Sequence, residues 1–389
     1  MNTEHWIDGK LESLRKEDLD RRLVMYPVSG GKLNIGDRLY LNFSSNDYLD
    51  LSNHPLIIQA ATEAAQSYGT GSGASRLLTG TLRIHDELET QLAKFKKYPA
   101  TLLFGSGYMA NAGVIPAIVG RNDVVFADRL AHASILDAIA LSRARLHRFR
   151  HNDVENLNDL LARYPHGRKL IVTESVFSMN GDLAPLREIA GLAAHHEALL
   201  MVDEAHAIGV FGPQGGGLVR EWELERSVNL CVGTLSKAMG SYGGFVTCSE
   251  RMKELLINRS RALIYSTAPP PPALGAAMGA LALLAAHPAL PTILLNRAAL
   301  FRGLLERAGL NTLNSQSQIV PVLMGSNAKA LDLSRRLRER GILAIAIRPP
   351  TIPQGSARLR FSITLAHTEE DLIRAANIVI AEAQSENLT

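Results

Sequence analysis

The stretch Val228–Val246, VNLCVGTLSKAMGSYGGFV, decides how the rest of the chain is interpreted, because it places one lysine in an unusual setting. Lys237 follows a short apolar run rich in β-branched residues, Val228–Val232, and precedes the glycine pair Gly243–Gly244. This pattern predicts a loop residue between two buried strands. A buried amine has a lowered pKa and then serves as a nucleophile that forms Schiff bases, or as a proton carrier. Taken alone, Lys237 is more simply interpreted as a surface lysine on a loop. A catalytic role for it therefore depends on the residues upstream.

Outward from this stretch, short apolar runs alternate with longer segments of helical periodicity from Tyr98 onward. The alternation predicts an α/β fold in which helices cover a parallel sheet. The predicted strands are Ala100–Phe104, Asp123–Ala127, Leu170–Thr173, Leu199–Val202, Leu230–Val232 and Phe245–Cys248. Ligands of such sheets bind beyond the carboxyl ends of the strands. Those ends carry polar clusters at residues 105–108, 128–132, 174–178, 203–206 and 234–237.

We expect three parts: an N-terminal arm over residues 1–45, a large domain over 46–285 and a small C-terminal α+β domain over 286–389. The arm combines a basic amphipathic helix, Leu11–Tyr26, with a strand, Leu39–Phe43. The C-terminal pattern predicts strands Ile319–Leu323, Ile342–Ile347 and Ala357–Thr364, a helix ending near Arg340, and a last helix after Thr368 with a capping box completed by Asp371.

Composition and charge exclude several classes of partner. The 389 residues carry 41 Lys and Arg against 38 Asp and Glu, a net charge of +3, and contain no polybasic block. We therefore expect neither nucleic acid nor membrane as a partner. The charged N-terminus predicts no signal or anchor, and the uncharged run Ala273–Ala286 is too short to span a bilayer and predicts a tightly packed buried helix. Cys231 and Cys248 lie in apolar runs without metal-type spacing, which favours buried thiols in a reducing cytoplasm.

The polar strand ends suggest one cofactor. Gly105–Tyr108 follows a strand and precedes a helical stretch, so its backbone N–H groups would face a phosphate at a helix N-terminus. Asp203 ends an apolar strand and needs a cationic partner, either a basic side chain or a protonated ring nitrogen. His206 follows within the same cluster. Together with Lys237, these groups fit pyridoxal phosphate, whose aldehyde, ring nitrogen and phosphate need such partners.

Several motifs occur together and in order: YLNFSSNDYL, GTGSGASRLLTG, GSGY, TESVFSMNGD, MVDEAHAIGVFG, GTLSKAMGSYGG, IYSTAPPPP and IRPPTIPQGSARLRFSIT. Through them the chain resembles, over nearly its whole length, the α-oxoamine synthases, a family of fold-type I pyridoxal phosphate enzymes. The resemblance implies a mostly parallel central sheet with helices on both faces plus a smaller C-terminal α+β domain. The GASR and RPPTIPQGSARLR segments are most similar to the family branch that serves biotin biosynthesis.

The resemblance also implies roles for residues that would hold the cofactor. Lys237 would carry pyridoxal phosphate as a Schiff base and then act as a base, while Asp203 would pair with the pyridine nitrogen. His206 would hydrogen-bond the ring oxygen, and His132 would stack on the ring. The remaining positions that match cofactor contacts are Gly107, Tyr108, Ser178, Thr234 and, reaching the phosphate from a neighbouring subunit, Thr267. The implied assembly is a homodimer with shared sites.

The substrate contacts implied by the resemblance lie at both ends of the chain. Asn46 and Arg360 match contacts to the amino-acid carboxylate, for which a planar guanidinium is suited. A structural role for Arg360 stays open, because another arginine lies two residues earlier on the same strand face. Thr351 matches a substrate-contacting position. The N-terminal arginine of the family corresponds to either Arg21 or Arg22.

The implied reaction is the condensation of L-alanine with a pimeloyl thioester, with loss of carbon dioxide. Either coenzyme A or an acyl carrier protein would carry the acyl group. The nearest alternative is a family member that uses glycine with acetyl-CoA or succinyl-CoA, since one methyl group changes substrate preference only modestly. An aminotransferase of the same fold and a non-catalytic pyridoxal phosphate-binding module are more distant alternatives.

Overall fold

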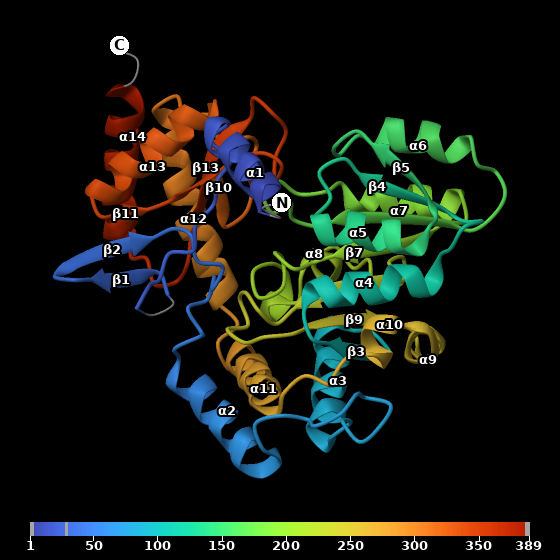
Figure 1. Cartoon of the computed structure of the whole chain (residues 1–389). Helices are drawn as coiled ribbons and strands as arrows, with labels where there is room; N and C mark the ends of the chain where they lie inside the picture. The colour runs from blue at the N-terminus through green and yellow to red at the C-terminus, as the bar shows by residue number, and fades with distance from the viewer. Residues whose placement is uncertain (1–3, 28–29, 386–389) are drawn as a thin grey trace. The chain divides into compact units, whose positions relative to one another are not determined.

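The computed structural model describes residues 4–27 and 30–385 (Figure 1). The chain packs as two compact units. The sheet unit comprises Asn46–Ser178 and Asp182–Leu295. The terminal unit comprises the described residues up to Ser45, the short segment Met179–Gly181 and the chain from Asn296 onward.

The sheet unit is built on a seven-stranded sheet of order β3-β9-β8-β7-β6-β4-β5. Its strands are β3 (Ala100–Phe104), β4 (Val124–Asp128), β5 (Arg145–Phe149), β6 (Lys169–Glu174), β7 (Leu199–Asp203), β8 (Leu230–Thr234) and β9 (Gly244–Cys248). The strands β5, β4, β6, β7 and β8 are paired in parallel, whereas β9 is antiparallel to β8 and β3. The mostly parallel sheet and its six predicted strands are thus confirmed.

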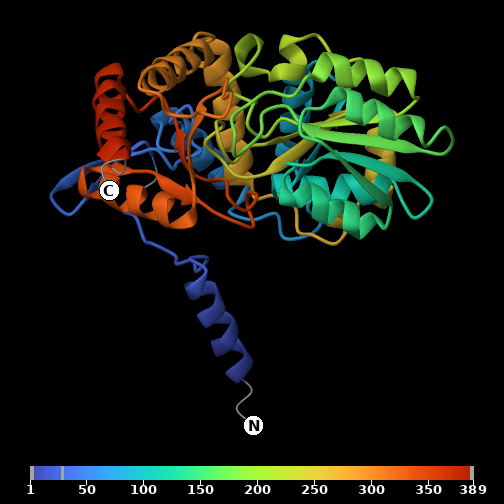
Figure 2. The same ribbon diagram turned by 90° about the horizontal axis from the view of Figure 1, so that it is seen from above.

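Helices cover both faces of this sheet, which explains why its central strands are apolar on both sides. In Figure 2 the teal helices α4 and α5 lie on one face and the green helices α6 and α7 on the other. A buried apolar core joins α4 and α5 to the sheet. The helices of the unit are α2 (Pro55–Tyr68), α3 (Arg83–Lys96), α4 (Gly107–Ile118), α5 (Ala133–Ser142), α6 (Val154–Ala162), α7 (Leu186–His195), the 3-10 turn η1 (Pro213–Gly215), α8 (Leu218–Glu221), α9 (Glu250–Arg259), α10 (Arg261–Ile264), α11 (Pro271–Ala286) and the start of α12 (Leu290–Arg307).

The terminal unit contains two three-stranded sheets of order β1-β2-β11 and β10-β13-β12. Leu41 on β2 pairs in parallel with Ile342 on β11, so the N-terminal strands share a sheet with the C-terminal part of the chain. Phe43 packs on Phe301 and Phe361 in the core of this unit. The elements are α1 (His5–Lys16), β1 (Lys32–Ile35), β2 (Arg38–Asn42), the rest of α12, β10 (Ile319–Gly325), α13 (Asn327–Glu339), β11 (Ile342–Leu343), β12 (Ile345–Ile347), β13 (Ala357–Ser362) and α14 (Glu369–Gln384).

Three local predictions were wrong. The predicted N-terminal helix, Leu11–Tyr26, is displaced toward the N-terminus: α1 ends at Lys16, because Asp18 adopts a left-handed conformation with φ of 55° and the chain then runs without helical structure. The predicted strand Ile342–Ile347 is two strands that belong to different sheets. The edge strand β5 was missed, because its arginines and histidine interrupt the apolar pattern. The capping box of α14, with Thr368 and Asp371, is confirmed.

The uncharged run that prompted a membrane test forms the buried helix α11. Among the described residues, no single helix is long and apolar enough to cross a membrane, and α11 and α12 pass that test only as a pair bent by 83°. Gly275 explains the close approach of α11 to α2: a Cβ atom placed there would lie 2.5 Å from the Ala60 carbonyl oxygen and 2.6 Å from the Ala64 Cβ. The predicted tight packing is confirmed.

Gly275→Val is therefore expected to destabilise the protein by about 1–3 kcal/mol, because the added side chain overpacks the contact between α11 and α2. Urea unfolding measures this change. Gly191→Ala in α7 is the control, since a Cβ there has nothing within 4 Å and should raise stability by about 0.5–1 kcal/mol. Equal effects of the two substitutions would contradict the packing argument.

Candidate active site

Lys237 lies in the loop between β8 and β9, half-buried, and contacts a histidine. Its Nζ atom is 2.7 Å from His206 Nε2, and His206 Nδ1 is 2.7 Å from the Tyr48 hydroxyl. The Tyr48 hydroxyl donates to Asn46 Oδ1 at 3.2 Å. The donors agree if His206 carries its proton on Nδ1, so that Nε2 accepts from the Lys237 amine. This contact rejects the alternative that Lys237 is a solvated surface residue.

A second chain of hydrogen bonds connects Asp203 with His132. Asn111 Nδ2 donates to Asp203 Oδ2 at 2.8 Å and to Ser134 Oγ at 2.9 Å. Ser134 Oγ lies 2.8 Å from His132 Nδ1. The other carboxylate oxygen of Asp203 accepts from the Ala205 backbone N–H at 2.9 Å. The carboxylate and the imidazole predicted to hold and stack on a cofactor ring are therefore oriented by one shared amide.

Glu174 brings a second buried carboxyl to the same edge, because the register of β6 and β7 pairs it with Asp203. Burial and then the Asp203 charge raise the pKa of Glu174 to about 8, although Lys237 opposes the shift. Glu174 Oε1 accepts the His132 backbone N–H at 2.7 Å. The surrounding protein partly shields the His132 ring from water, and this desolvation lowers the pKa of His132. The Asp203 charge opposes the shift and the Lys237 charge reinforces it. His132 is thus a neutral ring at neutral pH.

The predicted phosphate turn lies where β3 meets α4. Ser106 caps α4 and accepts the Met109 N–H at 3.1 Å, so the first N–H groups of a twelve-residue helix face outward from the sheet edge. A Cβ atom on Gly244 would lie 2.3 Å from the Ser106 carbonyl carbon, and one on Gly107 would lie 3.4 Å from Thr234 Cβ. Glycine at 244 therefore lets the start of β9 approach this turn, whereas a Cβ atom on Gly107 would lie at an ordinary van der Waals distance from the end of β8.

Three other predicted cofactor residues have mixed surroundings. Ser178 is buried in the loop after β6, and the exposed Tyr108 donates its hydroxyl to Asp137 Oδ2 at 2.6 Å. Thr267 is exposed and pairs with Ser75 in an isolated antiparallel bridge. Its contact with a neighbouring subunit stays a prediction.

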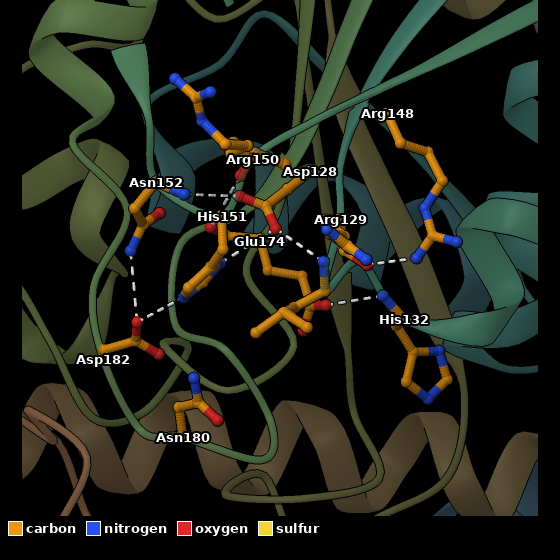
Figure 3. A network of polar contacts seen from close by, with 12 residues as sticks. Asp128, Arg129, His132, Arg148, Arg150, His151, Asn152, Glu174, Asn180 and Asp182 are labelled. Carbon is orange, nitrogen blue, oxygen red and sulfur yellow. Dashed lines mark hydrogen bonds and ion pairs between the residues drawn. The ribbon is translucent and has the colours of Figure 1, made fainter. Parts of the chain in front are cut away.

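A histidine network that was not predicted from the sequence supports the turn bearing His132 (Figure 3). His151 Nδ1 lies 3.0 Å from Asp128 Oδ1, and its Nε2 lies 2.6 Å from Asp182 Oδ2. Asp128 Oδ1 also accepts the Leu130 N–H at 2.7 Å. Burial alone would lower the pKa of His151, but hydrogen bonds and charge from both aspartates raise it to about 9. His151 is therefore an imidazolium at neutral pH. The only signal was the polar cluster RHND directly after an arginine-rich segment.

The predicted substrate contacts divide between the units. Asn46 belongs to the sheet unit and accepts the Tyr48 hydroxyl. The terminal unit contains the other four, which are Arg21, Arg22, Thr351 and Arg360. Arg21 Nη2 donates to the Pro349 carbonyl at 3.3 Å, in the turn that carries Thr351, while Arg22 lies 3.7 Å from Asp20. Within that unit Arg21 is thus the arginine associated with the turn. Arg360 is buried on β13 and donates to Ser362 Oγ at 2.8 Å.

The sheet unit therefore presents the donor set that pyridoxal phosphate needs. Three of these groups lie at the carboxyl ends of strands of one sheet: the buried carboxylate of Asp203 at the end of β7, the amine of Lys237 after β8 and the N-terminus of α4 after β3. An anionic phosphate suits the helix N-terminus, and a protonated pyridine nitrogen suits a buried carboxylate. The residues present fit the cofactor. The fold and site define a fold-type I pyridoxal phosphate enzyme.

Comparisons with known proteins agree. The model of the aminotransferase class I and II family matches residues 39–379. The 8-amino-7-oxononanoate synthase of Geobacter sulfurreducens is 48% identical over 95% of both chains, and that of Anaeromyxobacter sp. strain Fw109-5 is 50% identical over 94% of this chain and 92% of its own. A serine palmitoyltransferase from S. paucimobilis, solved with a pyridoxal phosphate–myriocin aldimine, superposes with a TM-score of 0.93 at 31% identity over 99% of this chain and 98% of its own. The 8-amino-7-oxononanoate synthase of Francisella tularensis superposes with a TM-score of 0.79 at 32% identity, covering 90% of this chain and 99% of its own.

The chain belongs to the aminotransferase class I and II family, and within it to the α-oxoamine synthase group, most similar to the 8-amino-7-oxononanoate synthases. The fold-type I architecture inferred from the sequence motifs is confirmed.

His151 generates a prediction about stability and pH. Because its pKa is raised from 6.5 to about 9 in the folded protein, it contributes stability that is complete below pH 6.5 and is lost as the pH rises through about 9. His151→Gln should therefore lower the free energy of unfolding by on the order of 3 kcal/mol below pH 6.5, and by progressively less as the pH rises through about 9. Urea unfolding at several pH values across this window measures the difference in stability between the wild type and the variant. The exposed His166→Gln is the control, and a gap that does not change with pH would refute the assignment.

Tyr48 generates a prediction about cofactor binding. Tyr48→Phe removes the partner of His206 Nδ1, so pyridoxal phosphate affinity should fall by about tenfold, equivalent to ~1.4 kcal/mol. Equilibrium titration monitored by absorbance measures the affinity. Tyr98→Phe is the matched control, because it removes another buried hydroxyl, bonded to the Val228 carbonyl at 3.0 Å, without touching His206. The control should lose stability but keep its affinity.

Proposed function

We propose that the protein is a pyridoxal phosphate-dependent acyltransferase that condenses L-alanine with a pimeloyl thioester to give 8-amino-7-oxononanoate and carbon dioxide. The observation that carries this proposal is the Lys237–His206 contact beside Asp203, in a chain about half identical to synthases of that name. The activity belongs to the biotin pathway, as the motif resemblance implies. A condensation that uses glycine is the alternative, and the rates of carbon dioxide release with alanine and with glycine distinguish the two.

Pyridoxal phosphate supplies an electron sink that stabilises negative charge on the α-carbon of a bound amino acid. Asp203, Gly107, Tyr108, Ser178 and Thr234 would hold it, with Asp203 on the ring nitrogen and the α4 N-terminus on the phosphate. His132 would stack on the ring and His206 would orient its oxygen.

The chain's own groups then account for proton movement. Lys237 Nζ would anchor the cofactor and, as a free amine, would take the proton from the α-carbon of the amino acid. His206 Nε2, at 2.7 Å, fixes the position of that amine. The His132 ring is neutral at neutral pH and accepts the Ser134 N–H on Nδ1, so its Nε2–H would donate a hydrogen bond that orients the acyl oxygen without adding a competing charge. The deprotonated α-carbon would then form a bond to the acyl carbonyl carbon as the thiol leaves with a proton. Carbon dioxide would be lost from the alanine carboxylate, and the α-carbon would regain a proton in its place.

Asn46 and Arg360 are the residues proposed for the carboxylate of the amino acid, and Thr351 and Arg21 are proposed as further substrate contacts. Arg21 is preferred to Arg22 for this role because it contacts the turn that carries Thr351. Either coenzyme A or an acyl carrier protein delivers the acyl group. Basic side chains of the arm are exposed and could face an anionic carrier, Arg15 among them and Lys16 through a surface ion pair with Glu12.

The working assembly is a homodimer in which Thr267 of one copy reaches the phosphate held by the other. The exposure of Thr267 supports this arrangement, since an exposed residue is accessible to a second copy. The protein acts in the cytoplasm, which agrees with two buried cysteines that form no disulfide.

The substrate test supplies purified protein with pyridoxal phosphate, pimeloyl-CoA and one amino acid at a time, and measures carbon dioxide release. Alanine should exceed glycine by at least about tenfold in kcat/KM, the discrimination that a single methyl group can provide, and should also exceed serine, which adds a hydroxyl group. Serine is included because a serine palmitoyltransferase shares the fold. Faster release with glycine or serine would overturn the assignment to alanine.

Lys237→Ala tests the anchor. The rate should fall by about 10²–10⁴-fold, the usual contribution of a positioned acid–base group. Borohydride should fix pyridoxal phosphate covalently to the wild type but not to this variant. Lys94→Ala, an exposed lysine on α3, is the control and should behave as the wild type in both measurements. Covalent fixation to Lys237→Ala at the wild-type level would refute the anchor.

A further inference from the structure

A fully buried ion pair lies directly behind the Asp203–His206 turn. Lys96, the last residue of α3, pairs with Glu204, and neither side chain is exposed. Lys96 Nζ also donates to the Gly216 carbonyl at 2.5 Å. Removing two charges from water is costly even when they pair and form hydrogen bonds. The protein therefore retains a costly arrangement at this position.

Glu204 connects three elements of the sheet unit. Its Oε1 accepts the Val219 N–H at 2.9 Å at the start of α8, and its Oε2 lies 3.2 Å from Cys231 Sγ on β8. A Cβ atom on Gly217 would lie 2.3 Å from Glu204 Oε2, so only glycine allows this loop to close over the carboxylate. With Lys96 on α3, the carboxylate is held from every side.

The backbone of Glu204 belongs to the active-site turn itself. Its N–H donates to the Val232 carbonyl at 2.8 Å, and its carbonyl accepts the Ala207 N–H at 2.9 Å. Because successive side chains at a strand end point to opposite faces, Glu204 faces the protein interior while Asp203 faces the site. The ion pair thus fixes the turn that carries Asp203 and His206 without entering the site.

Other roles for this cluster do not fit. Burial raises the pKa of the Cys231 thiol well above its usual range, which keeps the thiol protonated and unreactive. Among the described residues no group of three or more candidate ligands could hold a metal ion. A net stabilising role is also a weak explanation, because well-packed neutral replacements of buried ion pairs often keep or raise stability. What such a pair does provide is one defined geometry.

We propose that Lys96 and Glu204 are positioning residues, which hold Asp203 and His206 at the orientation required by pyridoxal phosphate and by Lys237. The proposal rests on the proposed function, since it assigns the pair to the same cofactor site. It predicts that neutralising both members together separates stability from cofactor geometry.

The test is the double variant Lys96→Met/Glu204→Gln, which keeps side-chain volume and leaves no unpaired buried charge. Its urea midpoint without cofactor should match the wild type, whereas pyridoxal phosphate affinity and kcat should each fall by about tenfold. The visible absorption of the bound cofactor should also titrate at a shifted pH. The matched control is Arg336→Met/Glu382→Gln, which removes a partly buried pair from the terminal unit and should leave affinity and spectrum unchanged.

Wild-type affinity, kcat and spectrum in a folded double variant would overturn the proposal and make the pair purely structural. If the double variant does not fold, Cys231→Ala replaces it, because it removes one contact to Glu204 without changing charge. A reduced pyridoxal phosphate affinity with unchanged stability would then support positioning, and unchanged affinity would overturn it. Failure of the wild type itself to bind pyridoxal phosphate through Lys237 would refute the proposed function instead, so the two failures are distinguishable.

Discussion

The pairing of β6 with β7 sets the electrostatic problem around which the site is arranged. The register places Glu174 beside Asp203, and both carboxyls are buried. Two adjacent carboxylates cannot both remain charged in such surroundings without cations. Glu174 responds by taking up a proton, with a pKa of about 8, and Asp203 keeps a position suited to a cationic ring nitrogen. The amine of Lys237 contributes the opposite charge from the loop after β8, and its chemistry follows from that setting.

Hydrogen bonds then convert this charge arrangement into a defined geometry. Asn111 joins Asp203 to the Ser134–His132 pair, and Tyr48 joins His206 to Asn46. Each of these side chains is supported by a second residue, so its orientation does not depend on a ligand. The same logic extends outward to His151, whose positive charge holds Asp128 and through it the turn before His132.

The sequence allowed the sheet and the lysine to be predicted because both have local signals. Apolar runs of three to five residues bounded by polar clusters mark buried strands, and Lys237 follows one of them. The Tyr48–His206 bond and the pairing of β2 with β11 join residues 158 and about 300 positions apart, so no local pattern indicates them. The edge strand β5 lacked a signal for a different reason: it is half solvated, and its arginines obscure the apolar alternation.

The division of the chain also bears on how specificity can change while the chemistry stays the same. Every residue that would hold the cofactor within one copy belongs to the sheet unit, whereas Arg21, Thr351 and Arg360 belong to the terminal unit. A serine palmitoyltransferase and 8-amino-7-oxononanoate synthases all superpose on or align with this chain, although their names specify different substrates. A charge arrangement fixed by strand register tolerates little variation, while a turn such as residues 348–356 can change without disturbing that register. Of the predicted substrate contacts, Asn46 alone belongs to the sheet unit, so the predicted contacts that could vary without touching that register lie in the terminal unit.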